Sequence, residues 1–180
     1  RFVMTPPLQD MLRKAATAHK YGHGHALVLT GGAARSGAAR LAGRGALRIG
    51  AGLVTLAVPP EAMTEVASQI TALMMQPLPD DAALAALLGD RRHTALCLGP
   101  GFGLEDHHAA LVAAALAGRR ATVLDADALT LLSRKAGLTG ALHPGCVLTP
   151  HEGEFARLFP DLAENLGDGP DARAAAVVAA

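Results

Sequence analysis

The sequence predicts an α/β fold built on a mainly parallel central sheet. Short apolar runs alternate with helical segments of about ten residues, which is typical of βαβ units. The runs are apolar throughout rather than alternating with polar residues, as expected where helices cover both faces of a sheet. Each run ends at a turn rich in Gly, Pro or Asp. A length of 180 residues suggests one such domain.

The pattern assigns the elements in order along the chain. We predict strands at residues 26–30, 53–58, 94–98, 121–124 and 146–148. We predict helices at residues 37–49, 61–72, 82–88, 105–117, 128–136 and 152–159. Residues 1–18, with two prolines and no initial Met, are expected to be a lead-in or linker from a longer chain. Residues 19–180 are expected to form the domain.

The composition limits which binding partners and which cellular compartment are expected. Basic and acidic residues number 16 each, so the basic surface of a nucleic-acid-binding protein is not expected. The longest apolar helical run, Ala109–Ala117, is far shorter than the roughly 20 residues of a membrane span. Cys97 and Cys146 lie in apolar runs without a CxxC spacing, which is typical of buried thiols in a reducing compartment. Because no signal peptide is evident, we predict a cytoplasmic protein with no nucleic-acid or membrane partner.

Four turns follow strands and are the candidate site, because ligands bind outside the carboxyl ends of strands in open α/β sheets. They are residues 31–37, 99–103, 125–127 and 149–154. The first matches neither GxGxxG nor GxxxxGK[ST], since Ala38 follows Gly37. Three arginines four residues apart on the next helix, Arg40, Arg44 and Arg48, are expected to be a solvated stripe.

The acidic turns allow two interpretations each. Asp127 at a helix start caps that helix, or it helps hold Mg²⁺ through water. Glu154 either complements the helix dipole or faces a ligand together with His151, three residues away.

Other polar residues are given no catalytic role. His19, His23 and His25 would need a further ligand to bind a metal, so no metal site is predicted there. His107 and His108 are expected to be exposed. No G-x-S-x-G elbow is present.

Taken together, the segments resemble the NAD(P)H-hydrate dehydratase family, which has a ribokinase-like three-layer α/β/α fold. The resemblance is carried, in order, by HKYGHGHALVLTGG, SGAARLAGRGALRIGAGLVTLAVP, CLGPGFG, VLDADAL and VLTPHEGEFARL. It implies a repair reaction, in which ADP or ATP, with Mg²⁺, drives dehydration of the S epimer of hydrated NADH or NADPH. The ring hydroxyl is phosphorylated, and loss of phosphate restores the double bond. It also suggests a fused N-terminal epimerase domain and a homo-oligomer such as a tetramer.

The resemblance assigns roles to matched residues. Ala38, Gly103 and His151 would contact the hydrated nucleotide, and Asp127 and Glu154 would lie near phosphate and Mg²⁺. Two residues depart from the family pattern. Glu152 stands where the family has Pro, which adds charge near the phosphate, and Phe102 stands where it has Leu, a change of volume.

The family's Lys-Gly segment and its Gly-Gly-x-Gly-Asp turn have no counterpart in this sequence. We therefore expect an incomplete domain, with no catalytic residue in this chain and the catalytic Asp beyond Ala180. Little activity is expected, since phosphoryl transfer depends on positioning and electrostatic stabilisation. The alternatives are a hydroxyethylthiazole or pyridoxal-type kinase of the same fold, or a non-catalytic remnant that binds nucleotide.

Overall fold

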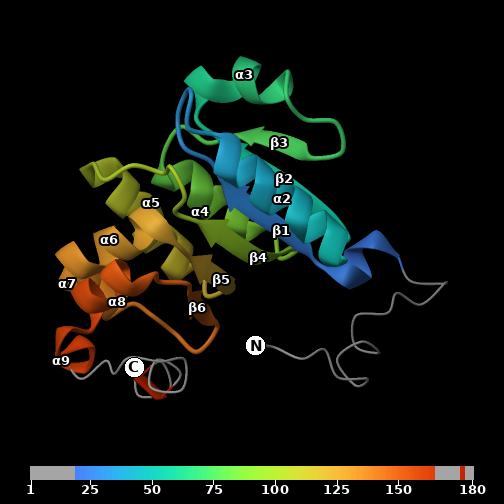
Figure 1. Cartoon of the computed structure of the whole chain (residues 1–180). Helices are drawn as coiled ribbons and strands as arrows, with labels where there is room; N and C mark the ends of the chain where they lie inside the picture. The colour runs from blue at the N-terminus through green and yellow to red at the C-terminus, as the bar shows by residue number, and fades with distance from the viewer. Residues whose placement is uncertain (1–18, 165–174, 177–180) are drawn as a thin grey trace.

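The computed structural model describes residues 19–164 and 175–176, and a single parallel sheet organises them (Figure 1). Its six strands have the order β3-β2-β1-β4-β5-β6, and every adjacent pair is parallel. The strands are β1 (His25–Leu29), β2 (Leu53–Val58), β3 (Met74–Pro77), β4 (His93–Leu98), β5 (Ala121–Leu124) and β6 (Cys146–Leu148). The predicted lead-in at residues 1–18 lies outside the described residues.

Helices connect the strands as βαβ units require. The longer ones are α2 (Gly37–Ile49), α4 (Asp81–Gly89), α5 (Asp106–Ala117), α6 (Ala126–Arg134) and α8 (Glu152–Leu158). The shorter ones are η1 (Lys20–His23), η2 (Pro60–Ala62), α3 (Met63–Ala67), α7 (Ala136–Thr139) and α9 (Pro160–Ala163). No helix among the described residues combines the length and apolar character that crossing a membrane requires.

The predicted elements are confirmed except between residues 61 and 77. The helix expected over residues 61–72 is wrong, because a 3-10 turn leads into the five-residue α3, which ends at Ala67. The strand β3 was not predicted. It is a short edge strand whose side chains are mostly exposed, so it lacks the apolar run by which the central strands are recognised.

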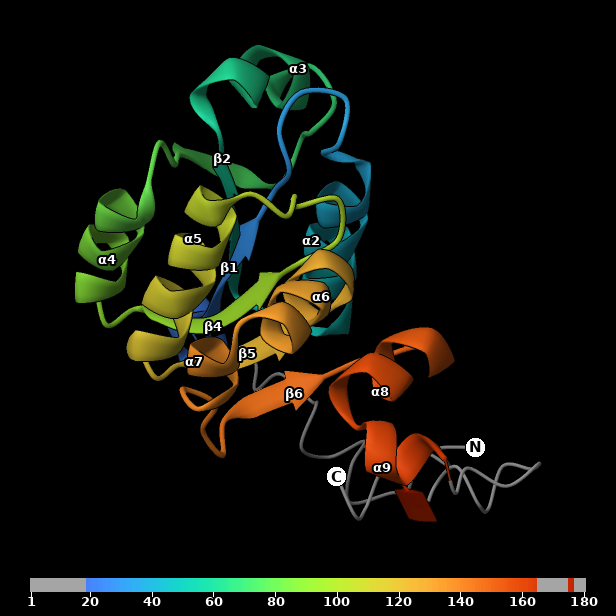
Figure 2. The same cartoon turned by 90° about the vertical axis from the view of Figure 1, so that its left-hand side faces the viewer.

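Two helical layers enclose the sheet (Figures 1 and 2). Helices α4, α5, α6 and α7 cover one face, where Leu27, Leu98 and Leu124 join their apolar side chains in the larger core. Helices α2 and α3 cover the other face, where Val28, Val54, Leu56 and neighbours form a smaller core. Adjacent residues of β1 therefore enter different cores, which explains why the strands are apolar at every position.

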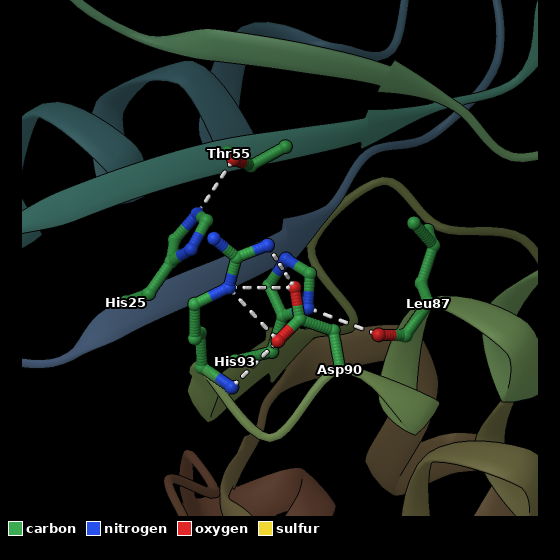
Figure 3. Close-up of polar contacts among 6 residues, drawn as sticks. His25, Thr55, Leu87, Asp90 and His93 are labelled. Atoms are coloured by element: carbon green, nitrogen blue, oxygen red, sulfur yellow. Dashed lines mark hydrogen bonds and ion pairs between the residues drawn. The ribbon is translucent and has the colours of Figure 1, made fainter. Parts of the chain in front are cut away.

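At the amino end of the sheet, two histidines and their hydrogen-bond partners form a polar cluster (Figure 3). His25 on β1 and His93 on β4 are buried and paired in register. Their ring centroids lie 4.5 Å apart. His25 Nε2 lies 2.7 Å from Thr55 Oγ1 on β2, and His93 Nδ1 lies 3.0 Å from the Leu87 carbonyl oxygen of α4. These bonds tie three strands and one helix together.

Candidate functional site

The candidate site lies where the strand order reverses. β1 and β4 are neighbours in the sheet, but the chain leaves β1 toward α2 on one face and leaves β4 toward α5 on the other (Figure 2). Ligands bind in the crevice that such a switch point opens at the carboxyl ends of strands. The turns after β1 and β4 border this crevice.

The turns at this edge touch through their backbones. A Cβ placed on Gly31 would overlap the Gly101 carbonyl oxygen, and one placed on Gly99 would overlap that of Asp125. Gly99 also has φ of 133°, a conformation that L side chains rarely adopt. The glycines of these two turns are thus required by the close approach of three successive loops.

The turn after β1 is held by a carboxylate from α3. Glu65 Oε2 accepts a hydrogen bond from the Ala34 backbone N–H at 2.6 Å, and Oε1 accepts one from Ser36 Oγ at 2.8 Å. The Ala34 bond, followed by the Ser36 bond, lowers the pKa of Glu65. Ala34 has φ of 61°, so these bonds hold a backbone conformation that is uncommon for a residue with a side chain.

The turn after β4 is held by Asp127 and His108. The Gly103 N–H donates to Asp127 Oδ2 at 2.9 Å. A Cβ on Gly103, which has φ of 115°, would overlap the His108 ring. The fold itself therefore requires glycine at this position, whatever the ligand.

Asp127 does not cap α6. Asp125 occupies the N-cap position, and the Asp127 carboxylate reaches across to the neighbouring turn instead. The capping interpretation is therefore wrong, and Asp127 positions the Gly103 loop.

His108 is not the exposed residue that the sequence suggested. Its ring packs edge-on against Phe102 at 5.0 Å between centroids, and its Nδ1 lies 2.7 Å from Glu105 Oε2. Burial, followed by the neighbouring His107, lowers the pKa of His108. His107 is exposed, as predicted. Phe102 is only 2% exposed, so it is a core residue at the base of the turn.

His151 and Glu154 form a capping box at the start of α8. His151 Nδ1 accepts from the Gly153 N–H at 3.1 Å. Glu154 Oε2 accepts from the His151 N–H at 3.0 Å, and Glu154 Oε1 lies 3.3 Å from His151 Nε2. Glu154 is buried, whereas the His151 side chain is 68% exposed. Because Nδ1 accepts a hydrogen bond, the other ring nitrogen is the one that faces a partner.

The structure joins the predicted site residues in two pairs. Gly103 contacts Asp127, and His151 contacts Glu154. Ala38 is exposed on the first turn of α2. Within residues 19–164, no hydrogen bond or ion pair joins the two pairs or links Ala38 to either. All of them lie on loops or helix starts at the carboxyl edge, where the strand pattern placed them.

The described residues provide no preformed cluster of ligands for Mg²⁺. Among the described residues, no group of three or more His, Cys, Asp or Glu side chains is placed to hold a metal ion. Glu154 is engaged in its capping box and Asp127 in its bond to Gly103.

The two cysteines are free and partly buried. Burial, followed by the charge of Asp125, raises the pKa of the Cys97 thiol. A thiol held protonated is a poor nucleophile, which agrees with the structural role predicted for it.

A cavity of about 500 Å³ lies at this edge beside the predicted residues. It is lined from the ends of β1, β2 and β3 and from the first turns of α5. Sequence reasoning did not single out its three charged residues, Arg35, Glu61 and Glu105. The available signal was their position, since each lies in the first few residues after a strand end or at the start of the following helix.

Solved structures define the class of protein. A ribokinase-like superfamily protein from Enterococcus faecalis has a TM-score of 0.74 at 19% identity, over 92% of this chain and 58% of that one. The chain thus has the ribokinase-like α/β fold. An ADP/ATP-dependent NAD(P)H-hydrate dehydratase from Bacillus subtilis, crystallised with ATP and Mg²⁺, has a TM-score of 0.68 at 25% identity. That match covers 87% of this chain and 55% of the other.

Sequence comparison then gives the family. The family described as NAD(P)H-hydrate dehydratase matches residues 26–178, and this chain belongs to it. A bifunctional NAD(P)H-hydrate repair enzyme of Gloeobacter violaceus is 38% identical over 84% of this chain and 30% of its own length. An ADP-dependent (S)-NAD(P)H-hydrate dehydratase of Lactiplantibacillus plantarum is 30% identical over 83% of this chain and 54% of its own length. The chain thus spans about a third to a half of these relatives.

Proposed function

We propose that this chain is the substrate-binding part of an enzyme that repairs nicotinamide nucleotides. The proposed reaction is ADP- or ATP-dependent dehydration of the S epimer of hydrated NADH or NADPH, by phosphorylation of the ring hydroxyl and elimination of phosphate. The observation that carries the proposal is the family match over residues 26–178. The names of the L. plantarum and B. subtilis relatives support the use of ADP or ATP.

The geometry supports a substrate-binding role at the carboxyl edge. Ala38 and His151 are exposed there, and the His151 ring, whose Nε2 lies 3.3 Å from Glu154 Oε1, is held in place by the capping box. Gly103 presents a backbone that Asp127 and His108 hold in place. Groups held in advance lose little freedom when a ligand binds. Mg²⁺, where it takes part, would come bound to the phosphates of ADP or ATP.

Titration of hydrated NADH into the 180-residue chain tests the proposal. We expect binding by calorimetry, with little recovery of dihydronicotinamide absorbance after addition of ADP or ATP. Absence of binding would contradict the proposal. Phosphorylation of a thiazole or pyridoxal alcohol in place of hydrate binding would favour a small-molecule kinase. Binding with no recovery at all would favour the non-catalytic remnant.

His151→Ala probes the predicted contact. We expect the affinity for hydrated NADH to fall several-fold, since one polar contact contributes on the order of 1 kcal/mol. His19→Ala is the matched control, because His19 is also exposed but precedes η1 at the opposite end of the sheet. Equal affinities for both variants would remove His151 from the site.

The remaining assignments are proposals of the same kind. An epimerase domain fused before residue 19 is supported by the bifunctional name of the G. violaceus relative. The oligomeric state and the cytoplasmic location rest on the resemblance and the composition.

A further inference from the structure

The cavity at the carboxyl edge is distinct from the predicted substrate contacts. Ala38, Gly103 and His151 do not line it. Its volume of about 500 Å³ lies within the range of small-molecule sites, about 300–1,000 Å³. Phe102 lines the cavity next to Gly103, and Arg35 lies three residues before Ala38. The cavity is therefore next to Gly103 and close along the chain to Ala38.

Two charged side chains of the cavity are available to a ligand. Arg35 is exposed, and its guanidinium has no hydrogen-bond or ion-pair partner among the described residues. Glu61 follows the two prolines that end β2, and its Oε1 would lie 3.3 Å from a Cβ placed on Gly32. The cavity thus offers one cation and one carboxylate, both close to the turn after β1.

A third charged residue is already engaged. Glu105 accepts a hydrogen bond from the Leu104 N–H at 3.0 Å and contacts His108 Nδ1. A hydrogen bond from its own backbone N–H, followed by the Leu104 bond and the charges of His108 and His107, lowers the pKa of Glu105. Glu105 therefore shapes the cavity wall and leaves ligand recognition to Arg35 and Glu61.

Six further residues of the wall are apolar. Their side chains are rigid or buried, and they come from the ends of β2 and β3, the turn after β4 and α5. They are Pro59, Pro60, Leu78, Pro79, Phe102 and Leu111. Leu78 and Phe102 are 4% and 2% exposed, so their positions are fixed by the core. Such a surface suits a planar ring, because burial of apolar area is favourable at about 25 cal/mol per Å².

We propose that this cavity binds the adenosine half of the hydrated dinucleotide. A phosphate oxygen would meet Arg35, the ribose hydroxyls would meet Glu61, and the adenine ring would lie against the proline-rich wall. Arginine suits phosphate, and a carboxylate beside a strand end suits ribose hydroxyls. The reacting nicotinamide half is left to Ala38, Gly103 and His151. The inference rests on the proposed function, because it takes the dinucleotide as substrate.

Two half-ligands separate the subsites. ADP-ribose carries the adenosine diphosphate group without nicotinamide, and nicotinamide mononucleotide carries the other half. In calorimetric titrations of the 180-residue chain, we expect ADP-ribose to bind and to displace hydrated NADH. Arg35→Gln should weaken ADP-ribose binding about tenfold or more, as expected for loss of a charge-assisted hydrogen bond. Glu61→Gln should weaken it by a smaller factor, and neither should alter binding of nicotinamide mononucleotide.

Arg44→Gln is the matched control. Arg44 is an exposed arginine of α2 that does not line the cavity, so its variant should bind both half-ligands as the parent chain does. Circular dichroism of all three variants checks that the fold is retained.

The possible outcomes distinguish a failure of the cavity assignment from a failure of the proposed function. Hydrated NADH that binds equally to the parent chain and Arg35→Gln, and that ADP-ribose does not displace, would overturn the cavity assignment and leave the proposed function standing. ADP-ribose that binds in an Arg35-dependent way without displacing hydrated NADH would assign the cavity to free ADP and also overturn it. Failure of hydrated NADH to bind at all, with ADP-ribose bound, would instead overturn the proposed function.

Discussion

At the carboxyl end of the sheet the turns after neighbouring strands meet through their backbones, whereas at the amino end two buried histidine rings pack against each other across β1 and β4. The turns after β1, β4 and β5 approach so closely that Gly31 and Gly99 have no room for a Cβ. At the opposite end, the buried rings of His25 and His93 occupy the same interval between β1 and β4 (Figure 3). Close backbone contacts and hydrogen bonds to carboxylates thus constrain the carboxyl end, whereas a buried histidine pair packs at the amino end.

Because of this difference, we expect the two ends of the sheet to respond to different substitutions and conditions. A ligand site benefits from backbone N–H groups at fixed positions, and the carboxyl end provides them because its loops hold one another. The amino end also has a close backbone contact, at Gly52, but it adds a buried histidine pair, of which His25 has a lowered pKa. Three substitutions or conditions test this contrast, in decreasing order of expected effect.

Gly99→Ala should cause the largest loss of stability. The added methyl group would overlap the Asp125 carbonyl oxygen, and the backbone has φ of 133°. A strained backbone costs about 1–3 kcal/mol, and overpacking costs about 1–3 kcal/mol more. Urea unfolding followed by circular dichroism measures the change. The control is Gly45→Ala, since nothing lies within 4 Å of that added Cβ, and alanine in a helix should stabilise by about 0.5–1 kcal/mol. Similar midpoints for the two variants would refute the role of loop contact.

Asp127→Ala should have an intermediate effect. It removes the acceptor of the Gly103 N–H, and loss of a hydrogen bond to a charged group costs about 1.5–3 kcal/mol. Hydrogen exchange at the Gly103 amide should accelerate while amides of β1 stay protected. Asp127→Asn keeps an acceptor oxygen and should restore much of the protection. Unchanged exchange in the alanine variant would show that the loop does not depend on this carboxylate.

Lowering the pH should produce the smallest effect, and the part of it that comes from His25 acts at the amino end. Burial, followed by the charges of His93 and Arg92, lowers the pKa of His25 below its ordinary 6.5, while Asp90 opposes the shift. The unfolded chain then takes up a proton more readily than the folded one. The free energy of unfolding is therefore expected to be level above pH 6.5 and to fall as the pH drops through the lowered pKa. Denaturant titrations between pH 7.5 and roughly pH 5 measure this slope.

His25→Gln should flatten the pH dependence, because glutamine can still bond to Thr55 but does not titrate. His108 also has a lowered pKa, so part of the slope should remain. An identical slope in parent and variant would exclude His25 as a source.

Sequence reasoning recovered the fold where patterns are strong. Helix Gly37–Ile49 and strands Leu53–Val58, Ala121–Leu124 and Cys146–Leu148 have the predicted bounds, because apolar runs between glycine and proline turns define them. β3 was missed since an edge strand has no such run. The roles of Asp127 and His108 were missed because their partners lie on other loops or across a turn, and a contact between separate loops leaves no periodic signal in the sequence.

For the candidate site, the sequence predicted where the turns lie better than which residues they contact. The turns at the carboxyl ends of parallel strands were expected to face one crevice, and they do lie at one edge. The pairing of His151 with Glu154 follows from a spacing of three in a helix, and the capping box makes that contact. Arg35 and Glu61 were not singled out, because the cavity that they line is formed by segments far apart in the sequence.

The central place of β1 has a consequence during synthesis on the ribosome. β1 finds its partner β2 soon after it emerges, but its other edge waits for β4, and 69 residues separate His25 from Thr94. At about 5–20 residues per second, roughly 3–14 s pass before that edge can be covered. In that interval Leu27 and Leu29, which are 0% and 1% exposed in the finished domain, lack their β4-side neighbours. The nascent chain therefore presents an unpaired apolar strand edge of the kind that promotes aggregation and that chaperones shield.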